Sequence, residues 1–482
     1  MKIENDRIST GIEQFDEIAG GGLLPKRTYL IRGGPGVGKS TIGLHFLCCG
    51  VRNNEKVLYI TLEESEEGIK LNNRNRIFDF SGINFLDISP TSEFFAQTQS
   101  YDIFSPAEVE REPVINKIME AVERLKPSRV FIDPLTQFRY FSSDILQFRK
   151  QALSFLKYLV EQGVTVMFTS ESSLQMPDDD LQFMSDGIID LSNDADNRGI
   201  SILKMRGTAY QSGKHAIKLS EKGLSIFPRL IPISQLKDFK FEILPSGIPE
   251  LDELLNGGIE RGTVTIVTGP SGVGKTTVGM QIMKEAAGRG EVSIVYTFEE
   301  EIEVILKRCD NIGMPARQMI DQKTLIIRKI EPLEMSADEF SSLVKQDVVK
   351  NNARIIMLDS IAGYRLCLKG DDLESRIHTL TKYLQNLGTA VLIINEVEYI
   401  TGDFRITDRN FSHIADNVIF MRYLEIDGEL RKAIGVLKKR LGGFENRLRE
   451  FEICKYGIKV GKPLVGLRGI LLGVPEFIKK NE

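Results

Sequence analysis

Short apolar runs alternate with longer amphipathic segments along most of this chain. The runs are rich in β-branched residues, span five to nine positions, and often end in a glycine-rich or acidic stretch. Apolar strands that alternate with helices indicate a parallel sheet whose two faces are both covered. We therefore expect an α/β fold, with a mostly parallel sheet flanked by helices. The runs lie at 28–33, 56–64, 129–133, 164–170, 263–269, 292–300, 354–359 and 390–396, and the clearest helical patterns lie at 39–49, 146–163 and 275–288.

The same series of motifs occurs twice along the chain. Lys39 and Lys275 each close a glycine-rich loop, and Asp133 and Asp359 each end an apolar run further along. The two aspartates lie closer together in the sequence than the two lysines do, which places about ten extra residues in the first copy. We expect these extra residues in the aromatic and polar stretch 91–108. A repeat of this length is typical of a duplicated domain rather than of a solenoid.

The boundary between the two copies is marked by proline. The segment 227–246 contains three prolines and connects the last motif of the first copy to the first motif of the second. Proline-rich connections are typical of linkers. We therefore expect two tandem domains, 1–235 and 236–482, each within the size range of a single domain.

Both copies contain a glycine-rich loop of the form GxxxxGK[ST], after a predicted strand and before a predicted helix. Glycines at this spacing let backbone N–H groups surround phosphate oxygens, and the helix N-terminus adds partial positive charge. The alternative is a glycine-rich turn that only connects a strand to a helix, but two copies in the required context favour nucleotide binding. The candidate nucleotide-binding residues of the two loops are Gly34, Gly36, Val37, Gly38, Lys39, Ser40, Thr41, Gly272, Val273, Gly274, Lys275, Thr276 and Thr277.

Oxygen ligands for Mg²⁺ are expected from two places in each copy. Ser40 and Thr276 follow the P-loop lysines, where the hydroxyl ligates the metal ion. Asp133 and Asp359 end hydrophobic strands, where a carboxylate meets Mg²⁺ or its water shell. The alternative for both aspartates is a helix N-cap, and their repetition at strand ends favours the metal site.

A pair of adjacent glutamates follows each P-loop lysine at the same spacing in both copies: Glu63 and Glu64 in the first, Glu299 and Glu300 in the second. One carboxylate of each pair can accept a proton from a water or hydroxyl nucleophile, while its neighbour raises its pKa by like-charge repulsion. Because adjacent strand residues point to opposite sides, we expect only one of each pair to face the phosphates. The alternative is a solvated acidic loop.

Basic residues recur late in each copy. Lys204 and Arg206 lie in LKMRG, and Lys438 and Arg440 lie in LKKRL. Cations at matching positions can reach the γ-phosphate of a neighbouring subunit, as arginine fingers do, if subunits form a ring. Surface lysines and arginines are more commonly just solvated.

Composition narrows the class of protein further. Of 482 residues, 42% are hydrophobic and 27% are charged, which excludes a disordered or fibrous chain. The 62 basic and 67 acidic residues give a net charge of −5, so nucleic acid is not favoured as a partner. Five cysteines without a CxxC spacing favour a reducing cytoplasm over a disulfide scaffold or a zinc site. We find no membrane-spanning run or signal peptide and expect a cytoplasmic protein.

Taken in order, these motifs resemble those of the KaiC family of bacterial clocks, which are double-domain RecA-like P-loop ATPases and autokinases. STGIEQFDEIAGGGLLPKRTYLIRGGPGVGKST and LKMRGTAYQSGKH resemble the first domain of the family. LDELLNGGIERGT, YTFEE, MLDSI and the run from DFRITDRNFSHIADN to GVLKKR resemble the second domain. The resemblance covers nearly the whole chain and is far more specific than a single P-loop.

The resemblance implies a homohexamer of two stacked rings, with ATP and Mg²⁺ held between neighbouring subunits. It implies slow ATP hydrolysis in the first ring and phosphoryl transfer in the second. The phosphoacceptors of the family are an adjacent Ser-Thr pair, which aligns with Ser412 and His413, so two-site phosphorylation cannot operate in its usual form. Thr407 matches a third hydroxyl position. The chain stops after GILLGVPEFIKKNE, where clock members continue into a tail that binds KaiA, so KaiA binding is doubtful. A KaiB-like partner stays open.

We therefore expect an ATP-hydrolysing hexamer that autophosphorylates in its second domain and acts in circadian-clock-like or stress signalling. One alternative is a RecA-like DNA-dependent ATPase or recombination mediator, which shares every P-loop residue. Another is a signalling scaffold that binds ATP to assemble and barely hydrolyses it.

Overall fold

The chain forms two compact units, Met1–Arg229 and Leu230–Glu482, in the computed structural model. The predicted domain boundary at 235/236 falls in the segment 233–237, outside the described residues, and stays a prediction. The described residues are 7–74, 76–89, 106–142, 144–171, 177–194, 197–232, 238–368, 373–397, 413–426, 428–468 and 476–477.

The first unit is built on a nine-stranded sheet, counted over its described residues, in the order β3-β2-β4-β5-β1-β6-β7-β8-β9. Neighbours from β3 to β6 run parallel, and those from β6 to β9 run antiparallel. The strands are β1 (Thr28–Gly33), β2 (Val57–Thr61), β3 (Ile83–Asp87), β4 (Arg129–Asp133), β5 (Thr165–Thr169), β6 (Gly187–Asp194), β7 (Asn197–Met205), β8 (His215–Ser220) and β9 (Gly223–Phe227). The helices are α1 (Glu13–Ile18), α2 (Lys39–Arg52), α3 (Glu66–Asn72), α5 (Pro106–Leu125), η1 (Leu135–Phe141), α6 (Ile145–Glu161) and α7 (Asp179–Met184).

The second unit repeats this topology over its described residues, in the order β14-β13-β15-β16-β12-β17-β18-β19-β20. Its strands are β12 (Val264–Gly269), β13 (Ser293–Thr297), β14 (Leu325–Lys329), β15 (Ile355–Asp359), β16 (Ala390–Glu396), β17 (Asn417–Ile426), β18 (Glu429–Lys439), β19 (Arg449–Cys454) and β20 (Gly457–Pro463). Two small sheets pair β10 (Ile243–Leu244) with β11 (Ile259–Glu260) and β21 (Leu467–Arg468) with β22 (Glu476–Phe477). Its helices are α8 (Pro249–Leu254), α9 (Lys275–Gly288), α10 (Ile302–Asn311), α11 (Ala316–Asp321), α12 (Ala337–Asn351), α13 (Ile361–Leu366) and α14 (Leu373–Asn386).

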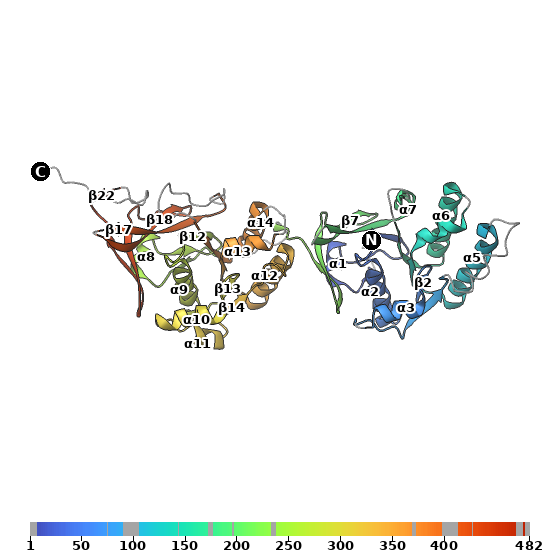
Figure 1. Ribbon diagram of the computed structural model, residues 1–482, viewed down its shortest axis with the longest axis horizontal. Coiled ribbons are helices and arrows are strands. Elements are labelled where there is room, and N and C mark those ends of the chain that lie inside the picture. The colour runs from blue at the N-terminus through green and yellow to red at the C-terminus, as the bar shows by residue number, and fades with distance from the viewer. Residues whose placement is uncertain are drawn as a thin grey trace. The chain divides into compact units, whose positions relative to one another are not determined.

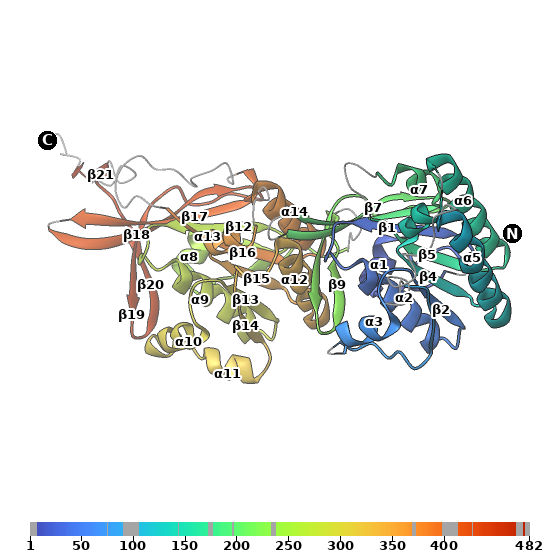
Figure 2. The ribbon, with the colours of Figure 1, turned by 45° about the vertical axis from the view of Figure 1, so that its right-hand side comes forward.

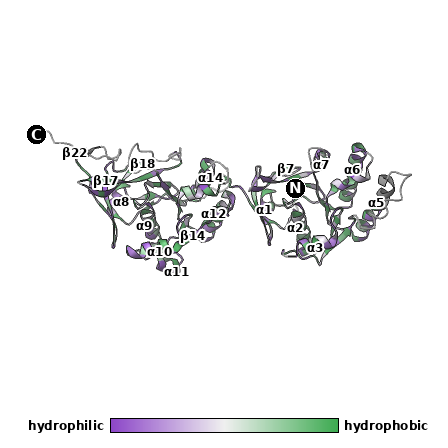
Figure 3. Cartoon of the chain, in the orientation of Figure 1, coloured by the Kyte–Doolittle hydropathy of each residue, from purple (hydrophilic) through white to green (hydrophobic). Residues whose placement is uncertain are grey.

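Helices cover both faces of each sheet, as Figures 1 and 2 show for α9 on one side of the second sheet and α12 and α14 on the other. The alternation of side chains along a strand divides each core into two clusters. In β4, Phe131 packs in the cluster of α2, while Val130 and Ile132 pack in the cluster of α5 and α6. Both faces are therefore apolar, which explains the continuous hydrophobic runs, while purple polar positions mark the helices α3 and α10 in Figure 3.

The two copies differ in length at two places rather than one. Val57 and Ile83 pair at the start of β2 and β3, and Ser293 and Leu325 pair at the start of the corresponding strands of the second unit. The interval between the paired residues is longer in the second unit, which places the helix α11 there. Between β3 and β4 it is the first copy that is longer, so the predicted surplus of the first copy is a net difference. The predicted α/β class, with two tandem RecA-like domains, is confirmed.

Candidate nucleotide-binding sites

Each P-loop joins the strand at the middle of the sheet to the following helix, β1 to α2 and β12 to α9. The glycine before each lysine caps the helix in the left-handed region, with φ of 109° at Gly38 and 117° at Gly274. A Cβ atom at Gly274 would lie 2.7 Å from Ile453 Cδ1, so both φ and space require glycine there. A glycine-rich loop that leads into a helix N-terminus is the arrangement in which backbone N–H groups bind phosphate.

Each P-loop lysine lies over its own loop. Lys39 Nζ donates to the carbonyl oxygen of Gly33 at 2.8 Å, and Lys275 Nζ donates to that of Pro270 at 2.8 Å. Lys275 Nζ also lies 3.8 Å from Glu396 Oε2. Burial lowers the pKa of both lysines, and nearby carboxylates oppose that change. Both ammonium groups are therefore held at the mouth of the loop that they close.

Asp133 and Asp359 lie at the ends of the strands β4 and β15, as predicted. Asp133 accepts hydrogen bonds from Tyr59 Oη at 3.0 Å and from Thr169 Oγ1 at 2.5 Å. Asp359 is buried, and burial raises its pKa to about 6, while a hydrogen bond from Thr276 lowers it. Asp359 therefore lies within hydrogen-bond reach of the hydroxyl predicted to share the metal ion.

The residues around Asp359 fit Mg²⁺. Asp359 Oδ2 is buried and has no hydrogen-bond partner among the described residues. A carboxylate and a threonine hydroxyl are hard oxygen donors, and Mg²⁺ is usually held by one or two carboxylates together with substrate phosphates. The described parts of the chain contain no cluster of three or more His, Cys, Asp or Glu side chains able to hold a metal by themselves. A site completed by phosphate oxygens agrees with both observations.

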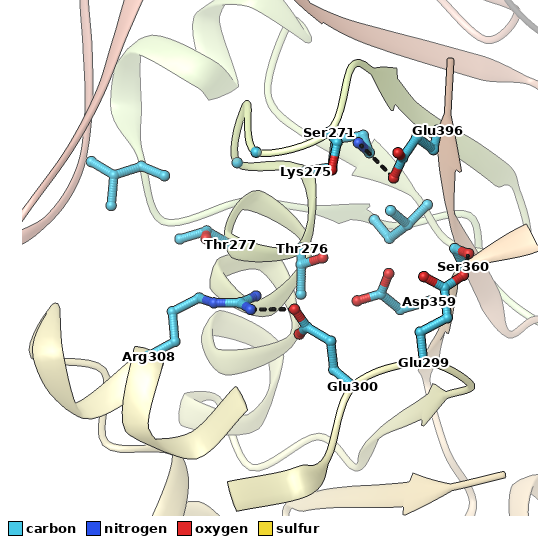
Figure 4. A pocket seen from close by; sticks show the side chains of 14 residues that line it. Ser271, Lys275, Thr276, Thr277, Glu299, Glu300, Arg308, Asp359, Ser360 and Glu396 are labelled. Atoms are coloured by element: carbon cyan, nitrogen blue, oxygen red, sulfur yellow. Dashed lines mark hydrogen bonds and ion pairs between the residues drawn. The ribbon is translucent and has the colours of Figure 1, made fainter. Parts of the chain in front are cut away.

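A cavity of about 410 Å³ opens in front of the second P-loop, as Figure 4 shows. Lys275 and Thr276 point into it from the start of α9, and Asp359 points into it from the end of β15. The cavity is mostly polar, and Ile453 of β19 gives it one apolar wall. Its lining residues are Ser271, Gly272, Gly274, Lys275, Thr276, Thr277, Glu299, Glu300, Arg308, Asp359, Ser360, Ile394, Glu396 and Ile453.

The first glutamate pair is divided between two environments. Burial raises the pKa of Glu63, and the charges of Glu171 and Asp133 raise it further. Glu63 also contributes to the electrostatic environment of Lys39. Glu64, by contrast, accepts a hydrogen bond from Asn72 Nδ2 in α3. The member of the pair that faces the P-loop is therefore Glu63.

The second pair is divided in the same way. Glu299 Oε1 accepts a hydrogen bond at 2.6 Å from Ser360 Oγ, the residue after Asp359. Glu300 Oε1 forms an ion pair with Arg308 Nη2, drawn as a dashed line in Figure 4. Both glutamates line the cavity, but Glu300 is held by a cation whereas Glu299 is held by a hydroxyl.

The late basic residues lie at the edge of each sheet opposite to the P-loop. Arg206 Nη1 lies 3.7 Å from Asp186 Oδ1, and Arg440 Nη1 lies 2.9 Å from Asp416 Oδ1. Asp186 accepts from the backbone N–H of Thr28, the first residue of β1, and Asp416 accepts from that of the first residue of β12. The P-loop follows the other end of these strands, so the arginines cannot reach the loop of their own unit.

The lysines of these motifs lie beside the arginines. Lys204 Nζ donates to the carbonyl oxygen of Gln182 at 3.0 Å, and Lys438 Nζ donates to that of Ala415 at 2.6 Å. Desolvation by burial lowers the pKa of both lysines, and the neighbouring arginine lowers it further.

The predicted phosphoacceptor Ser412 and Thr407, which matches the third hydroxyl position, lie outside the described residues. The neighbouring His413 is described, and its Nε2 lies 3.4 Å from Glu374 Oε1 of α14. Arg440 Nη2 donates to the carbonyl oxygen of His413 at 3.4 Å, so His413 lies beside the predicted finger.

Several residues at these sites were missed by the sequence analysis. Glu171 follows β5 and Glu396 ends β16, the strands beside the two P-loop strands, and both glutamates lie near the lysines. Asp186 and Asp416 hold the late arginines. The two members of each pair are separated along the chain by nearly the same number of residues as Asp133 and Asp359 are. A residue-by-residue alignment of the two copies would therefore have identified all four residues.

No helix in the described part of the chain is both long and apolar enough to cross a membrane. The family model described as "ATPase: KaiC" matches the chain twice, at residues 8–231 and 244–465. The chain is 27% identical to the circadian clock oscillator protein KaiC of Parasynechococcus marenigrum, over all of this chain and 95% of that protein. It is 28% identical to the circadian clock protein KaiC3 of Synechocystis sp., over 99% of this chain and 96% of that protein.

A further relative is the circadian clock oscillator protein KaiC of Synechococcus elongatus, 26% identical over 99% of this chain and 93% of that protein. The two family matches coincide with the two units and include both P-loops, both aspartates and both glutamate pairs. By these two matches, which together span most of its length, the chain belongs to the KaiC family of ATPases.

Proposed function

We propose that this KaiC-family ATPase assembles as a homohexamer, hydrolyses Mg²⁺-ATP in its first unit and transfers the γ-phosphoryl group to a hydroxyl in its second. The observation that carries the proposal is the repeated set around each P-loop: a lysine, a hydroxyl, a strand-end aspartate and one glutamate that faces the loop. A set that recurs in both units with the same geometry favours two working sites over one structural relic.

In the first site, Lys39 binds the β- and γ-phosphates, and Ser40 and Asp133 hold Mg²⁺. The metal ion, when bound, neutralises charge on the phosphate oxygens. Glu63 orients the attacking water and accepts its proton, and its raised pKa brings the carboxylate closer to the range in which a general base is effective. Because Glu64 is engaged by Asn72, it supports the position of the loop instead.

In the second site, Lys275, Thr276 and Asp359 have the corresponding roles. Glu299 accepts the proton of the acceptor hydroxyl, for which we propose Ser412. Support for Ser412 comes from the resemblance of the sequence around it, together with the approach of His413 to the predicted finger Arg440.

The position of the cations supports the proposed ring of subunits. Lys204 and Arg206, like Lys438 and Arg440, lie at the sheet edge opposite to their own P-loop. A cation that stabilises the transferred phosphoryl group must then come from a neighbouring copy, as an arginine finger does. A ring places one copy's cations at the next copy's nucleotide, and the KaiC-like first unit is where a KaiB-like partner would bind. The names of the relatives support clock-like signalling as the output, and stress signalling is the other output that we propose.

ATP hydrolysis by Lys39→Ala, Lys275→Ala and the double variant tests the enzyme. We expect each single variant to lose the contribution of one site and the double variant to lose activity. Lys157→Ala, at a lysine 73% exposed on α6, is the matched control and should hydrolyse ATP like the wild type. Unchanged hydrolysis by the double variant would refute the proposal, and hydrolysis that requires DNA would favour the recombination-mediator alternative.

Intact-mass spectrometry after incubation with ATP tests the phosphoryl transfer. We expect one added phosphoryl group in the wild type, none in Ser412→Ala or Glu299→Gln, and retention in Glu63→Gln, which alters only the first site. An unmodified wild type that still forms ATP-dependent hexamers would indicate a scaffold rather than an autokinase.

A further inference from the structure

The two nucleotide sites differ at one position that the duplication makes directly comparable. In the first unit, Asn72 of α3 donates to the carboxylate of Glu64, eight residues before it. In the second unit, Arg308 of α10 makes the same contact with Glu300, also eight residues before it. The interval from Asn72 to Arg308 along the chain equals the interval between the two P-loop lysines, so the two positions are equivalent. A neutral amide in one site is therefore a cation in the other.

Arg308 belongs to the nucleotide cavity as well as to this ion pair. It lines the cavity together with Thr276 and Thr277, the hydroxyl residues of the P-loop helix. In Figure 4 its side chain extends from α10 toward Thr276, with the guanidinium between the helix and Glu300. Its charge also contributes to the electrostatic environment of Asp359. The guanidinium therefore lies in the space where a nucleotide's phosphates would be bound.

Carboxylates outnumber cations among the described residues that line the second site. Lys275 is the P-loop cation, and Arg308 is the second cation among the described residues that line the cavity. The carboxylates that line it are Glu299, Glu300, Asp359 and Glu396. A bound triphosphate adds further negative charge to this cavity. A partly desolvated cation such as Arg308 offsets the repulsion between the phosphates and these carboxylates.

The geometry of a guanidinium allows it to hold a carboxylate and a phosphate together. Arginine has five N–H donors in a rigid fork and stays protonated in proteins. The ion pair with Glu300 uses Nη2, and the side chain of Arg308, which lines the cavity, is 33% exposed. The remaining donors are free to bind an incoming oxyanion without breaking the ion pair. Asn72, with two donors and no charge, cannot do the same.

We propose that Arg308 is a phosphate-binding residue of the second site, held in place by Glu300 and shared with the β- and γ-phosphates of a bound nucleoside triphosphate. It makes the second site a tighter triphosphate site than the first. This inference rests on the proposed function, because it assumes that the cavity binds ATP.

Equilibrium binding of ATP, ADP and AMP tests the inference, in a Lys39→Ala background so that the second site is measured. Arg308→Asn removes one charge-assisted contact, so this variant should bind ATP roughly tenfold or more weakly than the background protein does. AMP, which lacks the phosphates concerned, should bind within about twofold of the background protein. Arg308→Lys keeps the charge and should recover part of the ATP affinity. Arg317→Asn, at an exposed arginine of α11, is the matched control and should change nothing.

Three results would overturn the inference. ATP affinity unchanged by Arg308→Asn would show that the guanidinium does not contact phosphate. An equal loss for ATP and AMP would show that Arg308 acts only by fixing the local structure, and an ATP affinity as low in Arg308→Lys as in Arg308→Asn would show that its charge does not bind phosphate. If Arg308→Asn does not fold, Arg308→Lys carries the same comparison between ATP and AMP. Failure of the proposed function is distinct, since the Lys39→Ala protein would then bind no ATP at all.

Discussion

A buried histidine should make the stability of the first unit depend on pH. His45 lies on α2, the helix that begins at the P-loop lysine, and is 8% exposed. Its Nε2 accepts a hydrogen bond at 3.0 Å from the backbone N–H of Leu224, and its ring packs edge-on against Phe78. Burial, together with the charges of Arg52 and Arg76, lowers the pKa of His45 to about 4. The folded state therefore requires a neutral imidazole.

The sign and size of the effect follow from linkage. The unfolded chain binds a proton with a pKa of about 6.5, whereas the folded state does so only at about 4. Stability is therefore complete above about pH 6.5 and is lost as the pH falls from there to about 4. Integration gives a loss of about 2 kcal/mol at pH 5 and about 3 kcal/mol below pH 4.

His45→Gln isolates this contribution, because glutamine keeps an acceptor and does not titrate. The second unit already has glutamine at the equivalent position, Gln281, where it is buried. Hydrogen exchange of the Leu224 amide in the full chain reports on the first unit alone. Between about pH 7.5 and pH 5 we expect the wild type to lose about 2 kcal/mol more than the variant. Equal losses in the two proteins would refute the reasoning.

Three further changes have defined outcomes. Arg129 is 1% exposed and makes two 2.7 Å hydrogen bonds to the carboxylate of Glu55. Arg129→Ala should therefore lower the free energy of unfolding of the first unit by about 3 kcal/mol in urea. A loss below about 1 kcal/mol would contradict this. A Cβ at Gly43 would lie 2.2 Å from Phe131 Cζ, so Gly43→Ala should lower the melting temperature, because overpacking of about 1–3 kcal/mol exceeds the gain in helix propensity of about 1 kcal/mol. Asp416→Asn keeps a hydrogen-bond acceptor but removes the ion pair with Arg440, the predicted finger. ATP turnover at the second site should therefore fall severalfold while nucleotide affinity stays unchanged. A changed affinity would indicate a structural role for Asp416.

The sequence predicts the part of the fold that is buried on both sides. The strands β1, β2, β4 and β5 correspond to continuous apolar runs, because both of their faces contact helices. β3 was missed because only one of its five residues is buried. The antiparallel strands β6–β9 were missed for a related reason, since one face of this extension is exposed and its apolar residues are interrupted by polar ones.

The sequence predicts the candidate sites from residue types that recur at the same spacing in both copies. It does not predict the direction in which each side chain points. The spacing identifies Glu63 and Glu64 as a pair, and strand geometry predicts that one of them faces the phosphates. The structure identifies Glu63 as the glutamate that faces the P-loop, because Glu64 accepts a hydrogen bond from Asn72 in the following helix. The spacing of the sequence does not reveal this hydrogen bond. The function of Ser412 stays a prediction, because it lies outside the described residues.

The position of the basic pairs has a consequence for assembly. Because the P-loop and the basic residues lie at opposite ends of the same strands, the proposed contact between copies joins unlike surfaces. Such a contact is heterologous and generates either a closed ring or an open filament. In an open filament, the P-loop of the copy at one end has no neighbouring basic residues, and the basic residues of the copy at the other end contact no P-loop. Closure removes both ends at once, so turnover per chain should rise abruptly at the assembly size at which the ring closes.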